Sequence, residues 1–213
     1  MIKLYGLDVS GNTYKAKLLM HFLGVNYQFL TLDISQQEHK SPAFLKLNPR
    51  GEFPVLEDDS HIIWDSQAIL IYLARQYGAL PETRFWYPDS AAEIANITQW
   101  LCVANNEIFQ SLAKARSIIK FNHPGDLALA QKQGQAVLQW IEKHLSHNHW
   151  LSNNMPSIAD IACYPYIALC EEGKISLDSY SSIQQWLMRI QFLNNYIDMP
   201  GLYKPNSNIP EAL

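Results

Sequence analysis

All of the strand-like segments of this chain lie before residue 65, and this uneven distribution limits the possible folds more than any other feature. Residues 2–7 alternate in polarity over a short length, and residues 27–32 resemble a second strand. Between them, apolar residues recur at helical spacing until Gly24: Ala16, Leu19, Met20 and Leu23. A strand, a helix and a strand with short connections predict a βαβ unit with parallel strands and a right-handed crossover.

A second group of elements follows before residue 78. Ser41-Pro42 predicts the start of a short helix, which Asn48-Pro49-Arg50-Gly51 ends. Residues 54–57 and 61–64 are strand candidates around Asp58-Asp59-Ser60, a sequence that suits a hairpin turn. A helix over residues 67–77 comes next, so the order of elements is βαβ, then a helix, then ββα.

The rest of the chain contains no convincing strand. We expect a long helical stretch from Ser90 towards Phe121 and further helices that begin after Asp126, at Ser157 and near Ser181. Residues 79–88 include two prolines and no periodicity, which is typical of an interdomain linker. The sequence therefore predicts an α/β domain over 1–78, a linker over 79–88, and an all-α domain with a C-terminal tail over 89–213.

Composition excludes several functional classes. The chain has 213 residues, of which 48% are hydrophobic and 17% charged, so a sizeable core is expected and disorder is not. A net charge of −4 without a basic stripe argues against a nucleic-acid partner. No apolar stretch is long enough to span a membrane, and the N-terminal sequence does not resemble a secretory signal.

The cysteines and histidines suggest neither a disulfide framework nor a metal site. Cys102, Cys163 and Cys170 include no CxxC pair, and we expect them to be reduced in a cytoplasmic protein. His144, His147 and His149 lie near a predicted helix end, where histidines favour the helix dipole, and no cysteine is near them in sequence. We therefore predict that no metal is bound.

Three short segments could carry a binding site. Phe53-Pro54-Val55 begins a strand with a proline, which marks an edge or a special turn, and a cis bond there would let Val55 pair with an extended peptide. Asp65-Ser66 and Ser10-Gly11-Asn12 each precede a helix. They are sufficient as N-caps, but their free N–H groups could also bind a carboxylate or a thiolate.

Four segments resemble cytosolic glutathione transferases over essentially the whole chain, in particular the bacterial serine-type branch. They are LYGLDVSGNTYKAKLL, LNPRGEFPVLEDD, IIWDSQAILIYLARQYG and PSIADIACYPYIAL, and they occur in the family's order and at its separations. The resemblance implies a thioredoxin-like N-terminal domain that holds glutathione and a C-terminal helical bundle that shapes a pocket for a second substrate.

The resemblance also implies roles for individual residues. Ser10 matches the active-site hydroxyl of the serine-type branch, and Asn12 is the nearby alternative for assisting the sulfur of glutathione. Pro54, preceded by Phe53, matches the family's cis-proline, and Val55 the residue that pairs with the cysteinyl backbone of glutathione. Further matches are the pair that binds the γ-glutamyl end, Asp65 and Ser66, and a structural capping box from Ser157 to Asp160.

One departure from the family concerns the glycine end of glutathione. The family often places Lys or Gln there, whereas this chain has Glu52, which would put an anion beside an anion. Either Glu52 points away, or Arg50 or Lys15 supplies the positive charge. A second departure is the lack of any cysteine near Ser10, which excludes a dithiol mechanism and the single-cysteine chemistry of the omega and beta classes.

A hydrogen-bond donor at this position could activate glutathione without a base or a metal. Lowering the pKa of a thiol from about 8.5 to about 6.5 requires roughly 2.7 kcal/mol. A hydrogen bond to a charged group contributes about 1.5–3 kcal/mol and a helix N-terminus about 0.3–1 kcal/mol. We therefore interpret Ser10 as a donor to the sulfur and not as a nucleophile.

The predicted activity is attack of the glutathione thiolate on a small apolar electrophile by a cytoplasmic enzyme. Glutathione would be a co-substrate, with no permanently bound cofactor, and the family implies a homodimer. The second-substrate pocket is expected between the domains. Spacing places the first four of its helical candidates near one face, and the full set is Trp100, Val103, Ala104, Glu107 and Arg116, with Tyr14 from the first helix.

Two alternatives stay open at this point. The same site could reduce peroxides or disulfides with glutathione and without a protein cysteine. The chain could also be a non-catalytic glutathione-binding protein: Ser10 argues mildly against this reading and Glu52 mildly for it.

Overall fold

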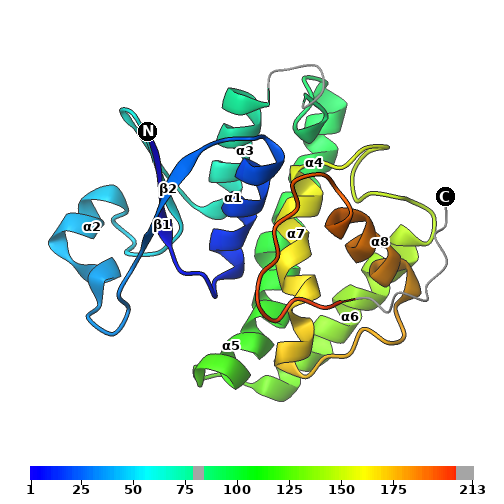
Figure 1. Cartoon of the computed structure of the whole chain (residues 1–213). Coiled ribbons are helices and arrows are strands. Elements are labelled where there is room, and N and C mark those ends of the chain that lie inside the picture. The colour runs from blue at the N-terminus through cyan, green and yellow to red at the C-terminus, as the bar shows by residue number, and fades with distance from the viewer. Residues whose placement is uncertain (79–83, 205–213) are drawn as a thin grey trace. The chain divides into compact units, whose positions relative to one another are not determined.

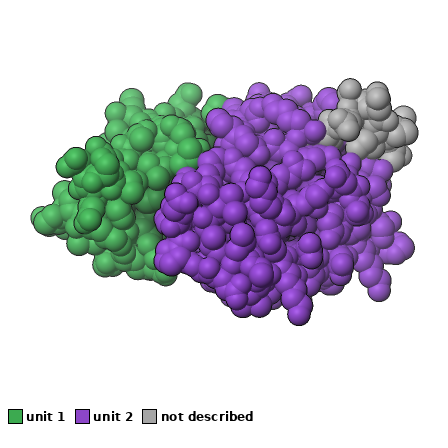
Figure 2. Space-filling model, turned by 90° about the horizontal axis from the view of Figure 1, so that it is seen from below, with its two compact units in different colours: residues 1–88 green, residues 89–213 purple. Residues whose placement is uncertain are grey.

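The computed structural model describes residues 1–78 and 84–204. The chain divides into two compact units, Met1–Pro88 and Asp89–Leu213 (Figure 2). The expected linker, residues 79–88, lies partly outside the described residues. Its end forms a short 3₁₀ helix, η2 (Arg84–Trp86), in which Trp86 is buried and stacks on Phe22 of the first unit.

The first unit contains a four-stranded mixed sheet with the strand order β2-β1-β3-β4. The strands are β1 (Ile2–Gly6), β2 (Tyr27–Thr31), β3 (Val55–Asp58) and β4 (His61–Trp64). β1 and β2 are parallel, as a βαβ unit requires, and β3 is antiparallel to both β1 and β4. The predicted hairpin is therefore confirmed, and it leaves β3 between two paired neighbours.

Helices cover both faces of this sheet (Figure 1). α1 (Gly11–Phe22) and α3 (Ser66–Tyr77) pack against each other on one face, and α2 (Pro42–Leu47) lies on the other after η1 (Glu38–Lys40). Under α2, Phe44 packs with Leu32 and Val55 in an apolar cluster. This arrangement confirms the predicted thioredoxin-like fold. The N-termini of α1 and α3, which carry the cap residues singled out in the sequence, both lie in this first unit.

The second unit begins with a helical stretch that changes character along its length. It consists of α4 (Ala91–Val103), a π-helix η3 (Ala104–Ala113) and α5 (Lys114–Phe121). The predicted helical stretch from Ser90 towards Phe121 is confirmed in its length, but the sequence did not predict that its middle is a π-helix. A π-helix bonds residue i to i+5, so side chains after Val103 leave the face that a 3.6-residue period would give them.

The remaining helices complete the bundle. They are α6 (Leu127–Leu145), α7 (Ile158–Ala168), η4 (Cys170–Gly173) and α8 (Ser181–Gln191). Helix α7 packs against α4 and η3, and α6 packs against η3, α5 and α8. Every residue of α7 is buried, as expected for a helix that is apolar on all sides and sits in the core. Ser157 and Asp160 form the predicted capping box at its N-terminus. No helix among the described residues is long and apolar enough to cross a membrane.

A partly buried ion cluster joins α5 to η4. The Glu172 carboxylate accepts a hydrogen bond of 2.5 Å from Arg116 Nε and another from Lys120 Nζ. Arg116 is only 3% exposed, and its Nη2 has no hydrogen-bond partner among the described residues. Burial by itself acts to raise the pKa of Glu172, but the hydrogen bonds from Lys120 and Arg116 outweigh it, and the pKa is lowered.

This cluster predicts a pH-dependent contribution to stability. The pKa of Glu172 is lower in the folded than in the unfolded chain. Its contribution to the free energy of unfolding is therefore complete at a pH above the unfolded-state pKa, and it disappears as the pH falls through the folded-state pKa. Glu172→Gln should lower the free energy of unfolding by about 1–3 kcal/mol at pH 7 and by much less near pH 3, measured by urea titration. An equal loss at both pH values would contradict the prediction.

The cysteines differ in their exposure. Cys102 on α4 is exposed, whereas Cys163 and Cys170 are buried and their Sγ atoms donate to the carbonyl oxygens of Trp100 and Ile175, respectively. Burial raises the pKa of the Cys170 thiol well above its ordinary value. Among the described residues, no group of three or more His, Cys, Asp or Glu side chains could hold a metal ion.

Candidate functional site

One hollow in the first unit brings together most of the residues that the sequence analysis assigned to glutathione. It is open, with a volume of about 300 Å³. Its lining combines the N-terminus of α3, the start of α1, the loop after α2 and the turn into β3. The lining residues are Asn12, Asn48, Arg50, Glu52, Phe53, Pro54, Trp64, Asp65 and Ser66.

The N-terminus of α3 forms one wall of the hollow. Asp65 caps this helix by accepting hydrogen bonds from Gln67 N at 2.9 Å and Ala68 N at 3.4 Å. Its backbone has a φ of 74°, a conformation that non-glycine residues rarely adopt and that is often found at functional sites. Ser66 is buried and donates from Oγ to Gln67 Oε1 at 2.9 Å. The helix N-terminus with its partial positive charge therefore faces the hollow.

At the start of α1, the two candidates for sulfur activation differ in position. Ser10 caps the helix: its Oγ accepts from Thr13 N at 3.3 Å, which leaves the hydroxyl hydrogen available to a ligand. Asn12 is one of the lining residues, and its Oδ1 is buried with no hydrogen-bond partner among the described residues. An orphaned buried amide oxygen costs free energy unless a ligand pairs with it.

The Phe53–Pro54 peptide bond is cis, as the family resemblance implies. Both residues line the hollow, and the Phe53 side chain packs against the cluster of Leu32, Phe44 and Val55. Val55 itself is fully buried inside β3 and is paired in register with Tyr5 of β1 and Trp64 of β4. Its backbone is thus enclosed by neighbouring strands, and it is Phe53, outside the ladder, that borders the hollow.

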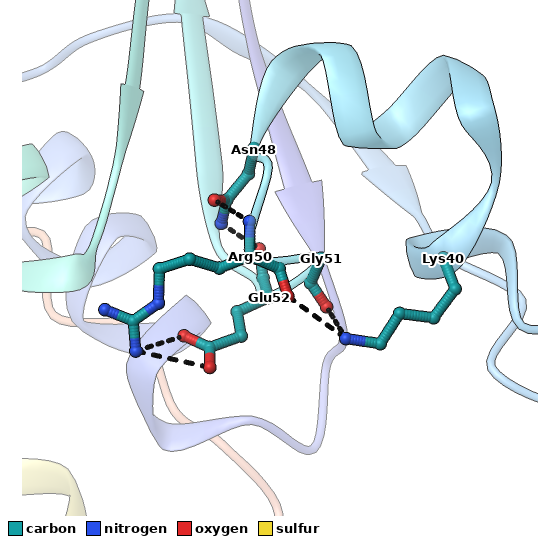
Figure 3. Close-up of polar contacts among 5 residues, drawn as sticks. All are labelled: Lys40, Asn48, Arg50, Gly51 and Glu52. Atoms are coloured by element: carbon teal, nitrogen blue, oxygen red, sulfur yellow. Dashed lines mark hydrogen bonds and ion pairs between the residues drawn. The ribbon is translucent and has the colours of Figure 1, made fainter.

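The loop after α2 is held by side-chain donors (Figure 3). Lys40 Nζ donates to Arg50 O at 3.1 Å and to Gly51 O at 2.9 Å, and Asn48 Nδ2 donates to Glu52 O at 2.7 Å. Asn48 Oδ1 also accepts from Arg50 N at 3.1 Å. Gly51 has a φ of 60°, and a Cβ there would lie 2.8 Å from His39 O. These contacts fix the backbone from which Arg50 and Glu52 extend.

Arg50 and Glu52 pair with each other at the rim of the hollow. The distances from Arg50 Nη2 to the two carboxylate oxygens of Glu52 are 2.9 and 3.3 Å. The Arg50 guanidinium also lies 5.9 Å from the centre of the Trp64 ring. Glu52 therefore does not point away from Arg50. Lys15, the other candidate for a positive charge, is fully buried and is not one of the lining residues.

The residues predicted for a second substrate differ in their exposure. Trp100 and Ala104 are buried, Val103 is half-buried and Glu107 is exposed, and the π-helix that starts at Ala104 interrupts the 3.6-residue period from which their shared face was predicted. Trp100 stacks on Trp140 with ring centres 5.0 Å apart. Arg116 is engaged in the ion cluster with Glu172, and Tyr14 is buried in α1.

Sequence reasoning missed two of the lining residues. Asn48 was interpreted only as a helix terminator, and Trp64 only as a strand residue. Nothing local in the sequence distinguishes them, because each enters the site through a tertiary contact: Asn48 through the loop it braces and Trp64 through the guanidinium of Arg50.

Comparisons with known proteins agree with this architecture. Residues 1–75 match the family model described as "Glutathione S-transferase, N-terminal domain", and residues 117–192 match "Glutathione S-transferase, C-terminal domain". The solved structure of a glutathione S-transferase from Pseudomonas fluorescens [Pf-5] is 33% identical, with a TM-score of 0.86 over 93% of this chain and 98% of that one.

Curated relatives differ in their activities. Glutathione S-transferase 3 of Zea mays is 28% identical over 75% of this chain and 73% of its own length. Disulfide-bond oxidoreductase YfcG of Escherichia coli (strain K12) is also 28% identical, over 90% of each chain. At this level of identity the comparisons define the family and the fold but not the reaction.

Proposed function

The chain belongs to the glutathione S-transferase family, and we propose that it binds glutathione in the hollow of residues 1–88 and transfers the thiolate to a small apolar electrophile. The observation that carries this proposal is the convergence, in one hollow, of a helix N-terminus, a cis-proline turn and an unpaired amide oxygen. These groups suit a carboxylate, a peptide backbone and, once the Asn12 amide turns its NH₂ group into the hollow, a thiolate; these are the three parts of glutathione that need recognition.

The γ-glutamyl end would lie at α3. Its carboxylate would accept hydrogen bonds from Ser66 N, at the start of the helix, and from the hydroxyl of Ser66 once that group turns from Gln67 Oε1; its ammonium would face the carboxylate of Asp65. The positive φ of Asp65 supports this role, because strained residues of this kind are typical of binding sites.

The cysteinyl residue would pair with the backbone beside Pro54. We assign this pairing to Phe53 in place of Val55, since the Phe53 ring is anchored in the apolar cluster while the residue still borders the hollow. Recognition by backbone pairing leaves the sulfur free to react.

The sulfur would lie at the start of α1, with Asn12 as its main hydrogen-bond donor and Ser10 as the second. Rotating the Asn12 amide about its Cβ–Cγ bond exchanges the oxygen for the NH₂ group, so this side chain can donate to a thiolate. Asn12 lines the hollow, whereas Ser10 is not one of its lining residues. This order of importance departs from the serine-type scheme.

The rest of the proposal follows the family. The protein would be a cytoplasmic homodimer that takes glutathione as co-substrate and holds no permanent cofactor. Contacts to the electrophile stay predictions for Tyr14, Val103 and Glu107. Trp100 and Arg116 are weaker candidates, because one is buried by Trp140 and the other is paired with Glu172.

A direct test is to titrate the thiolate absorbance of bound glutathione in the ultraviolet and then to measure turnover. We expect the pKa of the bound thiol to lie well below about 8.5, and an aryl halide to be conjugated faster than an organic hydroperoxide or a mixed disulfide is reduced. If the peroxide or the disulfide is turned over faster than the aryl halide, the proposed conjugation is wrong and the protein is a glutathione-dependent reductase. Binding without a lowered thiol pKa would make the chain a binding protein.

A further inference from the structure

The rim of the hollow carries an unusual balance of charge for a site that binds a peptide with two carboxylates. Three lining residues are charged, Arg50, Glu52 and Asp65, and together they give a net charge of −1. Asp65 would be matched by the ammonium of the ligand, as proposed above. Among the described residues that line the hollow, Arg50 is the one cation that could pair with the C-terminal carboxylate of glutathione, and it is already paired with Glu52. The nearby Lys40 ammonium is engaged by the carbonyl oxygens of Arg50 and Gly51.

The backbone that carries the pair is held in place from several sides. The backbone carbonyls of residues 50, 51 and 52 all accept hydrogen bonds from side chains of Lys40 or Asn48 (Figure 3). The Arg50 guanidinium also faces the Trp64 ring. Because the backbone of this loop is preorganised, the Glu52 side chain stays within reach of any carboxylate that approaches Arg50.

A ligand carboxylate that binds at this rim contributes little to the affinity. If it displaces Glu52 from Arg50, one carboxylate is exchanged for another of the same kind. If it shares Arg50 with Glu52, two negative charges lie side by side, and at the surface this repulsion corresponds to about a fivefold change in affinity.

We propose that Glu52 makes the hollow insensitive to the C-terminal carboxylate of its thiol peptide, so that γ-glutamylcysteinyl peptides with a blocked, uncharged C-terminus bind at least as well as glutathione. This inference rests on the proposed function, because it assumes the same hollow and the same orientation of the peptide. It narrows the substrate class to the γ-glutamylcysteinyl part and leaves the third residue free to vary.

The test compares glutathione with its C-terminal amide and its ethyl ester by isothermal titration calorimetry, in the wild-type protein and in Glu52→Gln. In the wild type we expect the amide and the ester to bind as tightly as glutathione or up to about fivefold more tightly. In Glu52→Gln, glutathione should gain about three- to tenfold in affinity while the blocked peptides change less than twofold. The gain should shrink at about 0.5 M salt.

Asp59→Asn is the matched control. It removes the same charge from an exposed side chain of the first unit that does not line the hollow. It should leave all three affinities unchanged, which separates a local effect of Glu52 from an effect of net charge.

Two results would overturn the inference, and only the second of them would also overturn the proposed function. A wild-type preference of more than about tenfold for glutathione, weakened in Glu52→Gln, would show that Glu52 positions Arg50 for the carboxylate; the proposed function would then stand and the inference would fail. If none of the three peptides binds, the proposed function fails and the inference fails with it.

Discussion

Replacing Asp160 with alanine should lower the free energy of unfolding by about 3–5 kcal/mol, which is a large part of the stability of a typical domain. The Asp160 carboxylate is fully buried and accepts from four donors. They are Leu151 N at 3.0 Å, Ser157 N at 2.9 Å, Ser157 Oγ at 3.3 Å and Trp186 Nε1 at 2.9 Å. Alanine leaves these buried donors without an acceptor, and each unpaired group costs about 1–3 kcal/mol.

Denaturant titration measures this loss, and Asp126→Ala provides the matched control. Asp126 caps α6 through Leu129 N at 3.0 Å, but it is exposed, so water can replace the lost bond and about 1 kcal/mol is expected. If Asp160→Ala does not fold, Trp186→Phe removes a single donor and should cost about 1–2 kcal/mol. Similar losses for Asp160→Ala and Asp126→Ala would show that burial of the carboxylate is unimportant.

The second large effect is expected from Asn12→Ala. A hydrogen bond to a charged group contributes about 1.5–3 kcal/mol, which corresponds to a thiol pKa higher by about one or two. If the wild-type thiol titrates near pH 6.5, the thiolate fraction at that pH should fall about five- to fiftyfold in the variant. Affinity for glutathione should change only a few-fold, because the γ-glutamyl and cysteinyl contacts remain.

Ser10→Ala tests the competing assignment and needs a control for its effect on the helix. Ser10 and Ser41 play the same capping role in the first unit, with Oγ accepting from Thr13 N at 3.3 Å and from Phe44 N at 3.2 Å. Ser41 does not line the hollow, so Ser41→Ala reports the cost of a lost cap alone. If Ser10→Ala raises the thiol pKa more than Asn12→Ala does, the serine-type scheme holds and our order of the two residues is wrong.

Local signals in the sequence were sufficient for most of the elements. Alternating residues predicted β1, cap residues predicted the starts of α1, α3 and α6, and the turn at Asp58-Asp59-Ser60 predicted the hairpin of β3 and β4. The Phe53–Pro54 cis bond followed from the family resemblance, since a proline alone predicts it only weakly.

Features that depend on distant contacts could not be predicted. No glycine or proline marks the change to a π-helix at Ala104, so its residues appeared to continue the preceding α-helix. The N-terminus of α8 is capped by Glu142, whose carboxylate accepts from Ser182 N and Ile183 N, both at 2.9 Å. Glu142 lies on α6, far from α8 in sequence. The placement of Val55 inside the sheet likewise depends on β1 and β4 together.

The positions of the cysteines bear on the proposed reaction with electrophiles, because the protein's own thiols would compete with that of glutathione for alkylation. Cys163 and Cys170 are buried, and the raised pKa of Cys170 keeps this thiol protonated and unreactive. Only Cys102 of the three is exposed. Self-inactivation during turnover would therefore concentrate on one position, and a single Cys102→Ser replacement would yield a catalyst that survives reactive substrates for longer.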